Sequence, residues 1–188
     1  MLRGGLAARP PGSSLADEWA WCWRAALLVL LFVPLHSLLE WPGLDGPLFA
    51  LNTATADAAM VWLATAGVPL AREGTLVLHA RGFATEVHQA CTLLLPSALL
   101  WVGITMHPHG RPGQKLAGML LGVVVVALVN QCRLVGVIWV GVQAPEWFGV
   151  VHGWLAPAWL LMLTTLYGGA WARAVRPKDS PSRPWVPL

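Results

Sequence analysis

The side chains of Cys91, Arg133 and His152 offer one coherent chemistry, although they lie far apart in the 188-residue chain. A cysteine is the strongest ordinary side-chain nucleophile once it is ionised, and a helix N-terminus or a nearby cation favours the thiolate. An imidazole can take up and return a proton near neutral pH. A guanidinium stays charged and can stabilise a thiolate or an oxyanion. The three residue types together predict acyl transfer through a thioester on Cys91.

Two further polar residues lie close to these positions in the sequence. Asn130 precedes Arg133 by one helical turn and shares its face, so we expect Asn130 either to orient Arg133 or to add a donor to the oxyanion. His88 precedes Cys91 by three residues and is a competing base, although its position favours a role at the junction between a hairpin and a helix. Each main candidate also has a plain structural interpretation: Cys91 as a small packing residue, Arg133 as a cation reaching the headgroups, and His152 as an interfacial histidine.

The composition indicates that these residues belong to a membrane protein. Hydrophobic residues make up 56% of the chain and charged residues 11%, with a mean hydropathy of +0.61. Because a soluble domain carries about 25% charged residues, so few charges argue against a cytosolic enzyme or a nucleic-acid-binding protein. The chain also has 12 tryptophans, and tryptophan is enriched at membrane–water interfaces. We therefore predict an all-α polytopic transmembrane helix bundle, a single domain over residues 1–188, with the lipid bilayer as a partner and no nucleic acid.

Four apolar runs are predicted to cross the bilayer, since a spanning helix needs about 20 mostly apolar residues. The first run follows Arg3 and Arg9 and could be a signal peptide, but no small-residue cleavage pattern follows it, which favours a retained span. The four predicted spans are residues 19–39, 91–106, 116–142 and 150–171.

Lysine and arginine residues set the predicted orientation, because short cytoplasmic loops carry them in excess. The loop over residues 107–115 and the tail after Trp171 are basic, whereas residues 144–149 contain an acid and no base. We therefore predict a multi-pass protein with cytoplasmic N- and C-termini. Residues 48–67 could form a fifth span, but a fifth span would break the parity of this arrangement, which favours an interfacial or half-inserted helix.

Two segments outside the spans have a different character. Residues 75–87 contain two short β-prone runs around Arg81 and Gly82, which predicts a short extracytoplasmic β-hairpin leading into Cys91. Residues 177–188 are rich in proline and predict a disordered cytoplasmic tail.

The predicted spans bring the three candidate residues to one level of the membrane. Arg133 lies 18 residues after Lys115, which is about 27 Å along a helix and nearly the thickness of the hydrocarbon core. Cys91 begins the second predicted span at its outer end, and His152 lies near the start of the fourth. The three side chains are therefore expected to converge at the outer face of the membrane.

Three sequence strings resemble the exosortase/archaeosortase family in their order and spacing. They are Phe-Ala-Thr-Glu-Val-His-Gln-Ala-Cys at residues 83–91, Asn-Gln-Cys-Arg at 130–133 and Glu-Trp-Phe-Gly-Val-Val-His at 146–152. The resemblance covers residues 60–172, and the short N-terminal part is most similar to the H-type exosortases.

This resemblance implies a membrane-embedded cysteine transpeptidase of the bacterial inner membrane. Such an enzyme cleaves C-terminal sorting signals of exported proteins at the outer face of that membrane, and each signal consists of a short motif, a transmembrane helix and a basic cluster. By resemblance, Cys91 is the nucleophile, Arg133 the stabilising cation and His152 the general base and acid. The family usually has glycine two residues after the cysteine, where this chain has Leu93, and the change is expected to affect the backbone beside Cys91 or the range of substrates.

Other classes of function remain as alternatives. The chain could be a non-enzymatic membrane scaffold or a haem-binding subunit of an export or polysaccharide system, although its histidines lack a metal-binding spacing such as H-E-x-x-H. A thiol oxidoreductase would need a second cysteine near Cys91, and Cys132 is a candidate by depth. Neighbouring helical residues point about 100° apart, however, so Cys132 is not expected to share the face of Arg133. No cofactor or metal is predicted.

Overall fold

The computed structural model describes residue 30, residues 33–34 and residues 37–176. The predicted first span, residues 19–39, lies largely outside this part of the chain, and the predicted tail, residues 177–188, lies wholly outside it. The elements are the 3-10 helix η1 (Pro42–Leu44), helix α2 (Asp45–Thr65), strands β1 (Ala71–Glu73), β2 (Leu76–Leu78) and β3 (Ala84–Glu86), the 3-10 turn η2 (Gln89–Cys91), helices α3 (Leu94–Met106) and α4 (Pro112–Gln143), the 3-10 turn η3 (Pro145–Trp147), the helical turn α5 (Phe148–Val150), the π-helical turn η4 (Val151–Leu155) and helix α6 (Ala156–Ala174).

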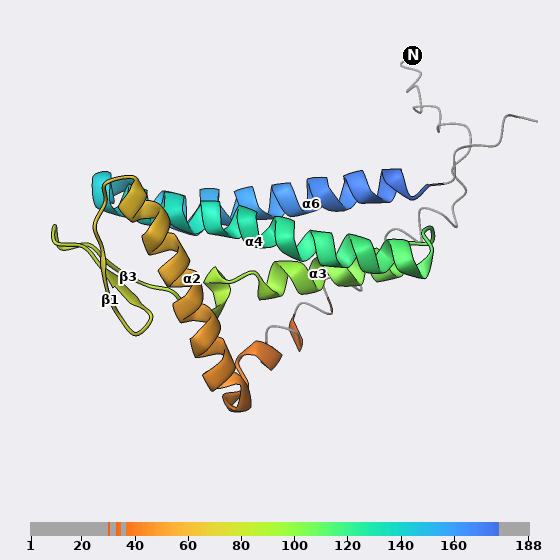
Figure 1. Cartoon of the computed structure of the whole chain (residues 1–188), viewed down its shortest axis with the longest axis horizontal. Coiled ribbons are helices and arrows are strands. Elements are labelled where there is room, and N and C mark those ends of the chain that lie inside the picture. Colours follow the sequence, from red (N-terminus) through yellow and green to blue (C-terminus); the bar gives the residue numbers. More distant parts are fainter. Residues whose placement is uncertain (1–29, 31–32, 35–36, 177–188) are drawn as a thin grey trace, which may run out of the picture.

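Helices α3, α4 and α6 run side by side and form the body of the molecule (Figure 1). Helix α4 and the continuous helical stretch Pro145–Ala174 are each long and apolar enough to cross a membrane. Four residues recur along one face of α4, and each is more than half exposed: Leu116, Leu120, Val124 and Leu128. An exposed apolar face of this length is typical of a helix in lipid. The predicted helical membrane architecture is therefore supported, with two of the predicted spans, 116–142 and 150–171, present as helices of sufficient length.

The predicted second span is shorter than the sequence suggests. Helix α3 has 13 residues and begins at Leu94, three residues after the predicted start at Cys91. Pro96 explains the later start, because it has no N–H to donate to the carbonyl of Thr92 and its ring would crowd that carbonyl in a helix. At 1.5 Å per residue α3 extends about 20 Å, which is less than the thickness of the hydrocarbon core.

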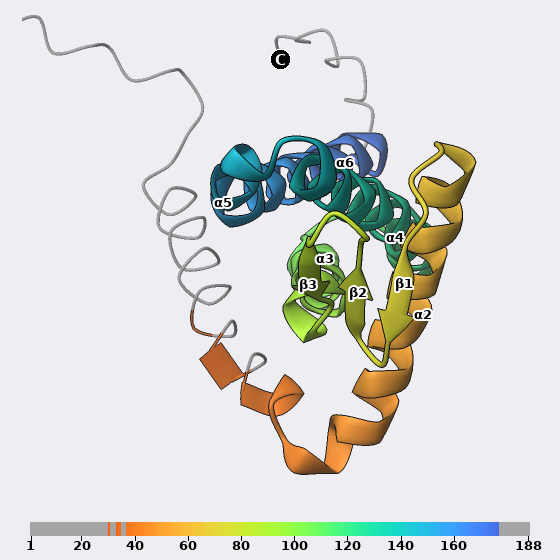
Figure 2. The same ribbon diagram turned by 90° about the vertical axis from the view of Figure 1, so that its left-hand side faces the viewer.

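Helix α2 lies at one end of this three-helix body and crosses the direction of α4 at a steep angle (Figure 1). It covers residues 45–65, close to the predicted 48–67, and it is not among the described helices that are apolar enough to span a membrane. Its position in the membrane interface stays a prediction. The strands lie at the same end of the body, with β1 beside α2 and β3 in front of α3 (Figure 2).

The strands form an antiparallel sheet in the order β1-β2-β3. Strands β2 and β3 are the predicted hairpin, with Val77 opposite Thr85, and Gly82 occupies its turn with a φ of +86° that favours glycine. Strand β1 is an addition that the sequence does not predict, because its three residues include two charges and lack the alternation of a strand. Arg72 of β1 is held by Asp57 of α2, with an N–O distance of 2.7 Å.

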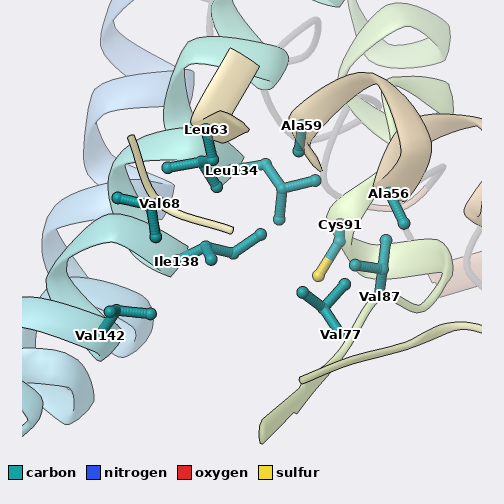
Figure 3. Close-up of a cluster of buried hydrophobic side chains, with 10 residues drawn as sticks. All are labelled: Ala56, Ala59, Leu63, Val68, Val77, Val87, Cys91, Leu134, Ile138 and Val142. Atoms are coloured by element: carbon teal, nitrogen blue, oxygen red, sulfur yellow. The ribbon is translucent and has the colours of Figure 1, made fainter. Parts of the chain in front are cut away.

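Two clusters of buried side chains hold these elements together. One cluster lies among α3, α4 and α6, where Leu100, Ile104 and Val126 are buried. The other, which is called the first cluster because it begins earlier in the chain, joins α2, the sheet and α4 (Figure 3). Its members are Ala56, Ala59, Leu63, Val68, Val77, Val87, Cys91, Leu134, Ile138 and Val142. The candidate nucleophile is therefore part of the core that fixes the sheet to the helices.

Two glycines of α4 let aromatic rings of α6 come close. A Cβ atom on Gly118 would overlap the Trp171 ring, and one on Gly122 would lie 2.7 Å from Leu100 Cδ2 of α3 and 3.0 Å from Tyr167 Cε1. Tyr167 also donates a hydrogen bond to the Gly118 carbonyl at 2.7 Å. The missing side chains at these two positions therefore set the spacing between α4 and α6.

Replacing Gly118 by alanine is expected to destabilise the protein, because overpacking against Trp171 costs about 1–3 kcal/mol. Gly136→Ala is a matched control in the same helix, since a Cβ atom there meets no atom within 4 Å and alanine favours a helix over glycine by about 1 kcal/mol. Thermal unfolding in detergent should show a lower midpoint for Gly118→Ala and an equal or higher midpoint for Gly136→Ala. Equal midpoints for the two variants would contradict the close packing of α4 on α6.

Candidate active site

Cys91, Arg133 and His152 line one small cavity. They come from η2, α4 and η4, three elements that are well separated in the sequence. The remaining lining residues are Thr85, Glu86, Leu134 and Val137. The structure thus brings together all three side chains in which the sequence suggests catalytic chemistry.

Cys91 ends the 3-10 turn η2 and precedes the α-helix instead of opening it. Its N–H donates to the carbonyl of His88 at 2.7 Å, and the residue is only 4% exposed. Figure 3 shows its sulfur extending between Ile138 and Val77 of the first cluster. A thiol in apolar surroundings is inert unless a base or cation activates it, so any chemistry here depends on the other residues of the cavity.

Asn130 connects the cysteine to the arginine through both ends of its side-chain amide. Its Nδ2 donates to the Cys91 carbonyl at 2.7 Å, and its Oδ1 accepts a hydrogen bond from Arg133 Nε at 3.2 Å. Both Asn130 and Arg133 are buried. Of the two roles expected for Asn130, the geometry favours orienting Arg133, because both polar groups of the amide already have partners.

One buried nitrogen of the Arg133 guanidinium is not used in this arrangement. Its Nη2 is buried and has no hydrogen-bond partner within the described part of the chain. Because buried polar groups are nearly always hydrogen-bonded, an unpartnered guanidinium N–H marks a place for an acceptor. In this cavity it is suited to stabilise negative charge on a sulfur or on a carbonyl oxygen.

His152 lies in the π-helical turn η4, five residues before Pro157. Pro157 has no N–H for the carbonyl of Gly153 and would crowd it in an α-helix, which accounts for the wider turn. The His152 ring packs against Phe148 with ring centroids 5.2 Å apart, and Phe148 packs edge-on against Phe83 at 5.3 Å. His152 Nδ1 is buried without a partner in residues 37–176, so no competing hydrogen bond has to break when this nitrogen exchanges a proton.

The aromatic residues that fix His152 are not among the candidates taken from the sequence. Phe83 lies against Gly141 of α4, where a Cβ atom would overlap its ring. The four-residue spacing of Phe148 and His152 is a signal that could have revealed their contact, because residues one helical turn apart share a face. Thr85 carries no comparable signal, since its place in the cavity depends on how β3 packs on the helices.

The competing base, His88, is exposed between β3 and η2 and does not line the cavity. It interacts electrostatically with His152, as Arg133 does. His36, another histidine that could serve the haem-binding alternative, lies outside the described residues. Within the part of the chain that is described, no three His, Cys, Asp or Glu side chains are grouped so that they could hold a metal ion.

The second cysteine of the oxidoreductase alternative does not line the cavity of the first. Cys132 is exposed and lines a different hollow, whereas Cys91 is buried in the cavity. The structure therefore gives no support to a Cys91–Cys132 disulfide, as the angle between neighbouring helical residues predicts. Cys22 lies outside the described residues.

Leu93, which replaces the usual glycine, sits just before α3 with φ −78° and ψ −7°. These are ordinary right-handed values, so the backbone beside Cys91 does not need glycine. The Leu93 side chain packs against the cluster among α3, α4 and α6. The leucine therefore anchors the start of α3 without straining the turn that carries the cysteine.

An apolar groove of about 470 Å³ adjoins the cavity, between α4 and the helical stretch formed by η4 and α6. Arg133 and Val137 line both hollows. The other groove residues are Cys132, Gly136, Val140, Val151, Leu155, Ala156, Ala158, Trp159 and Met162. The groove therefore connects the surface of the two spanning helices with the candidate site.

The fold and the site define a helical membrane protein in which a thiol, a guanidinium and an imidazole face one cavity. The chain belongs to the transmembrane exosortase family, which matches residues 16–167. This match covers most of the chain and confirms the resemblance of the three sequence strings. No curated protein and no solved structure matches the chain.

Asn130→Ala is expected to destabilise the protein by about 1.5–3 kcal/mol, because it removes a hydrogen bond from a buried charged group. Gln131→Ala is the matched control: its side chain donates to the Thr55 carbonyl at 3.3 Å, a neutral bond worth about 0.5–1.5 kcal/mol. Unfolding midpoints in detergent should fall further for Asn130→Ala than for Gln131→Ala. The opposite order would show that the link between Cys91 and Arg133 does not stabilise the fold.

Proposed function

We propose that this exosortase-family protein is a cysteine peptidase and transpeptidase that cleaves C-terminal sorting signals of exported proteins at the outer face of the bacterial inner membrane. The observation that carries the proposal is the shared cavity of Cys91, Arg133 and His152, in which Arg133 Nη2 has no partner among the described residues. Membership of the transmembrane exosortase family supports the same class of activity.

The proposed reaction assigns one role to each side chain. The Cys91 sulfur attacks the carbonyl carbon of the scissile peptide bond while His152 takes the thiol proton. Arg133 Nη2 donates to the oxygen that gains negative charge. When the intermediate collapses, the C–N bond breaks, His152 returns the proton to the leaving amine, and the new carboxyl end stays on Cys91 as a thioester. Water or an amine then attacks the thioester carbonyl, the C–S bond breaks, and the proton that the nucleophile loses passes through His152 to the sulfur, which restores the thiol.

The distribution of charge supports an outward-facing site. The loop between α3 and α4 and the C-terminal end of α6 lie at the end of the bundle away from the sheet (Figure 1). Arg111 lies in this loop and Lys115 in the first turn of α4, and Arg173 and Arg176 lie at and just after the end of α6. Because basic ends of membrane helices favour the cytoplasm, the sheet and the cavity are assigned to the opposite, periplasmic side.

The groove beside the cavity supports a substrate that arrives through the bilayer. It is apolar, it lies on α4 and α6, and it shares Arg133 and Val137 with the cavity. A protein anchored by an apolar C-terminal helix can place the residues next to that helix at the cavity while the helix itself stays in lipid. The proposed partners are therefore membrane-anchored exported proteins.

Removing the thiol should abolish processing. Cys91→Ala and Cys91→Ser are each expected to leave a co-expressed substrate uncut, because neither side chain supplies a thiolate at neutral pH. The substrate is a secreted reporter fused to the C-terminal segment of an exported protein of the same organism that ends in a motif, an apolar helix and basic residues. Immunoblotting of reporter length gives the readout, with Cys22→Ser as the control for loss of a thiol elsewhere. Full processing by Cys91→Ala would refute the proposal.

Arg133→Lys is expected to lower processing by about 10²–10³-fold, the cost of losing an oxyanion donor. Lysine keeps the charge but lacks the planar fork that bonds Asn130 with one nitrogen and presents another to the cavity. The rate of reporter cleavage in membranes, normalised to protein level, measures the effect. Wild-type rates in Arg133→Lys would mean that the arginine only positions its neighbours.

A further inference from the structure

We propose that the outer edge of β3 binds the substrate as an added β-strand, so that the scissile stretch lies extended beside Cys91. The inference rests on the proposed function and adds how the enzyme recognises the backbone of its substrate. Strand β3 is the last strand in the sheet order β1-β2-β3, so β2 pairs with only one of the two edges of β3.

Hydrogen bonds around the hairpin fix the direction of the backbone groups of β3. Val87 donates to the Thr75 carbonyl at 2.9 Å, and Thr85 is two residues before Val87, so both face β2. Since residues of an antiparallel strand alternate in direction, Ala84 and Glu86 point their N–H and C=O groups away from β2. Both residues are exposed. No backbone hydrogen bond to either outward-facing residue is found from another element in residues 37–176.

This free edge borders the candidate site. Thr85 and Glu86 line the same cavity as Cys91 and Arg133. Neighbouring side chains of a strand point to opposite faces, so a cavity that touches both residues reaches the edge of the strand. A strand added at this edge would lie about 4.8 Å from β3 and would border the cavity that Cys91 and Arg133 line.

The chemistry of the site also requires an extended occupant. In a helix the carbonyl oxygen of a peptide bond already accepts a bond from the residue four positions later, and neighbouring turns cover it. Strand addition leaves alternate carbonyls facing away from the sheet and gives affinity through main-chain bonds. The opposite edge of the sheet, β1, lies beside α2 (Figure 2), and none of its three residues lines the cavity of Cys91. Only the β3 edge therefore combines free backbone groups with access to Cys91 in the described part of the chain.

A proline at the outward position tests the backbone contact. Ala84→Pro removes the outward N–H without breaking a bond to β2, and edge strands tolerate proline. Ala84→Val adds a side chain of similar size but keeps the N–H. We expect kcat/KM for the reporter to be about tenfold or more lower in Ala84→Pro than in Ala84→Val, the effect of one lost bond of 1.4 kcal/mol. Equal values in two variants with wild-type unfolding midpoints would overturn the proposal.

Disulfide trapping tests the geometry without relying on turnover. In a background with Cys22, Cys91 and Cys132 each changed to serine, Ala84→Cys supplies the only thiol of the enzyme. Single cysteines are then placed at successive reporter residues before its apolar helix. Strand addition predicts cross-links at every second position, because side chains alternate along a strand. Ala71→Cys on the exposed edge of β1 is the matched control and should give no such pattern.

The outcomes separate this inference from the proposed function. Cross-links with a period of three to four residues, no cross-links, or a disulfide joining two copies of the enzyme would overturn strand addition while Cys91-dependent cleavage stands. Processing that survives Cys91→Ala would overturn the proposed function itself. Alternating cross-links together with Cys91-dependent cleavage would support both.

Discussion

A buried arginine in a membrane helix is the constraint on which the rest of this structure depends. Burying a charged group away from water is costly unless the group is paired and hydrogen-bonded, so a buried guanidinium needs partners. Arg133 finds one in Asn130, one turn earlier on the same helix. Because Asn130 also binds the Cys91 carbonyl, the turn η2 cannot shift without disturbing a bond to the buried charge. The position of the cysteine is thereby tied to the position of the arginine.

The convergence of the three candidate residues could be predicted because it depends on the fixed rise of an α-helix. Helix α4 is unbroken from Pro112 to Gln143, so counting residues from its N-terminal end gives a dependable position for Arg133 along the helix. The three-residue spacing of Asn130 and Arg133 likewise predicts a shared face, and the structure places a hydrogen bond there. Where the chain is regular, sequence arithmetic is enough to place side chains.

The features that the sequence does not predict arise where regular geometry is interrupted or where segments distant in sequence meet. Pro96 delays the start of α3, and Pro157 accompanies the π-helical turn that carries His152. The contact between Asn130 and the Cys91 carbonyl joins residues 39 positions apart, and nothing in either local pattern indicates it. Strand β1 likewise cannot be predicted from the sequence, because pairing with β2 and an ion pair to α2 hold it in place. Tertiary packing decides each of these details.

Helix α4 serves as the common reference for all parts of the candidate site. Asn130 holds η2 through its hydrogen bond to the Cys91 carbonyl, whereas Gly141, about three turns further along, accepts the Phe83 ring in place of a side chain. Phe83 packs on Phe148, and Phe148 packs on the ring of His152. The cysteine and the histidine are therefore each positioned relative to α4, by different kinds of contact. Because one rigid helix fixes both, the geometry of the cavity does not depend on direct contact between the loops that carry the two side chains.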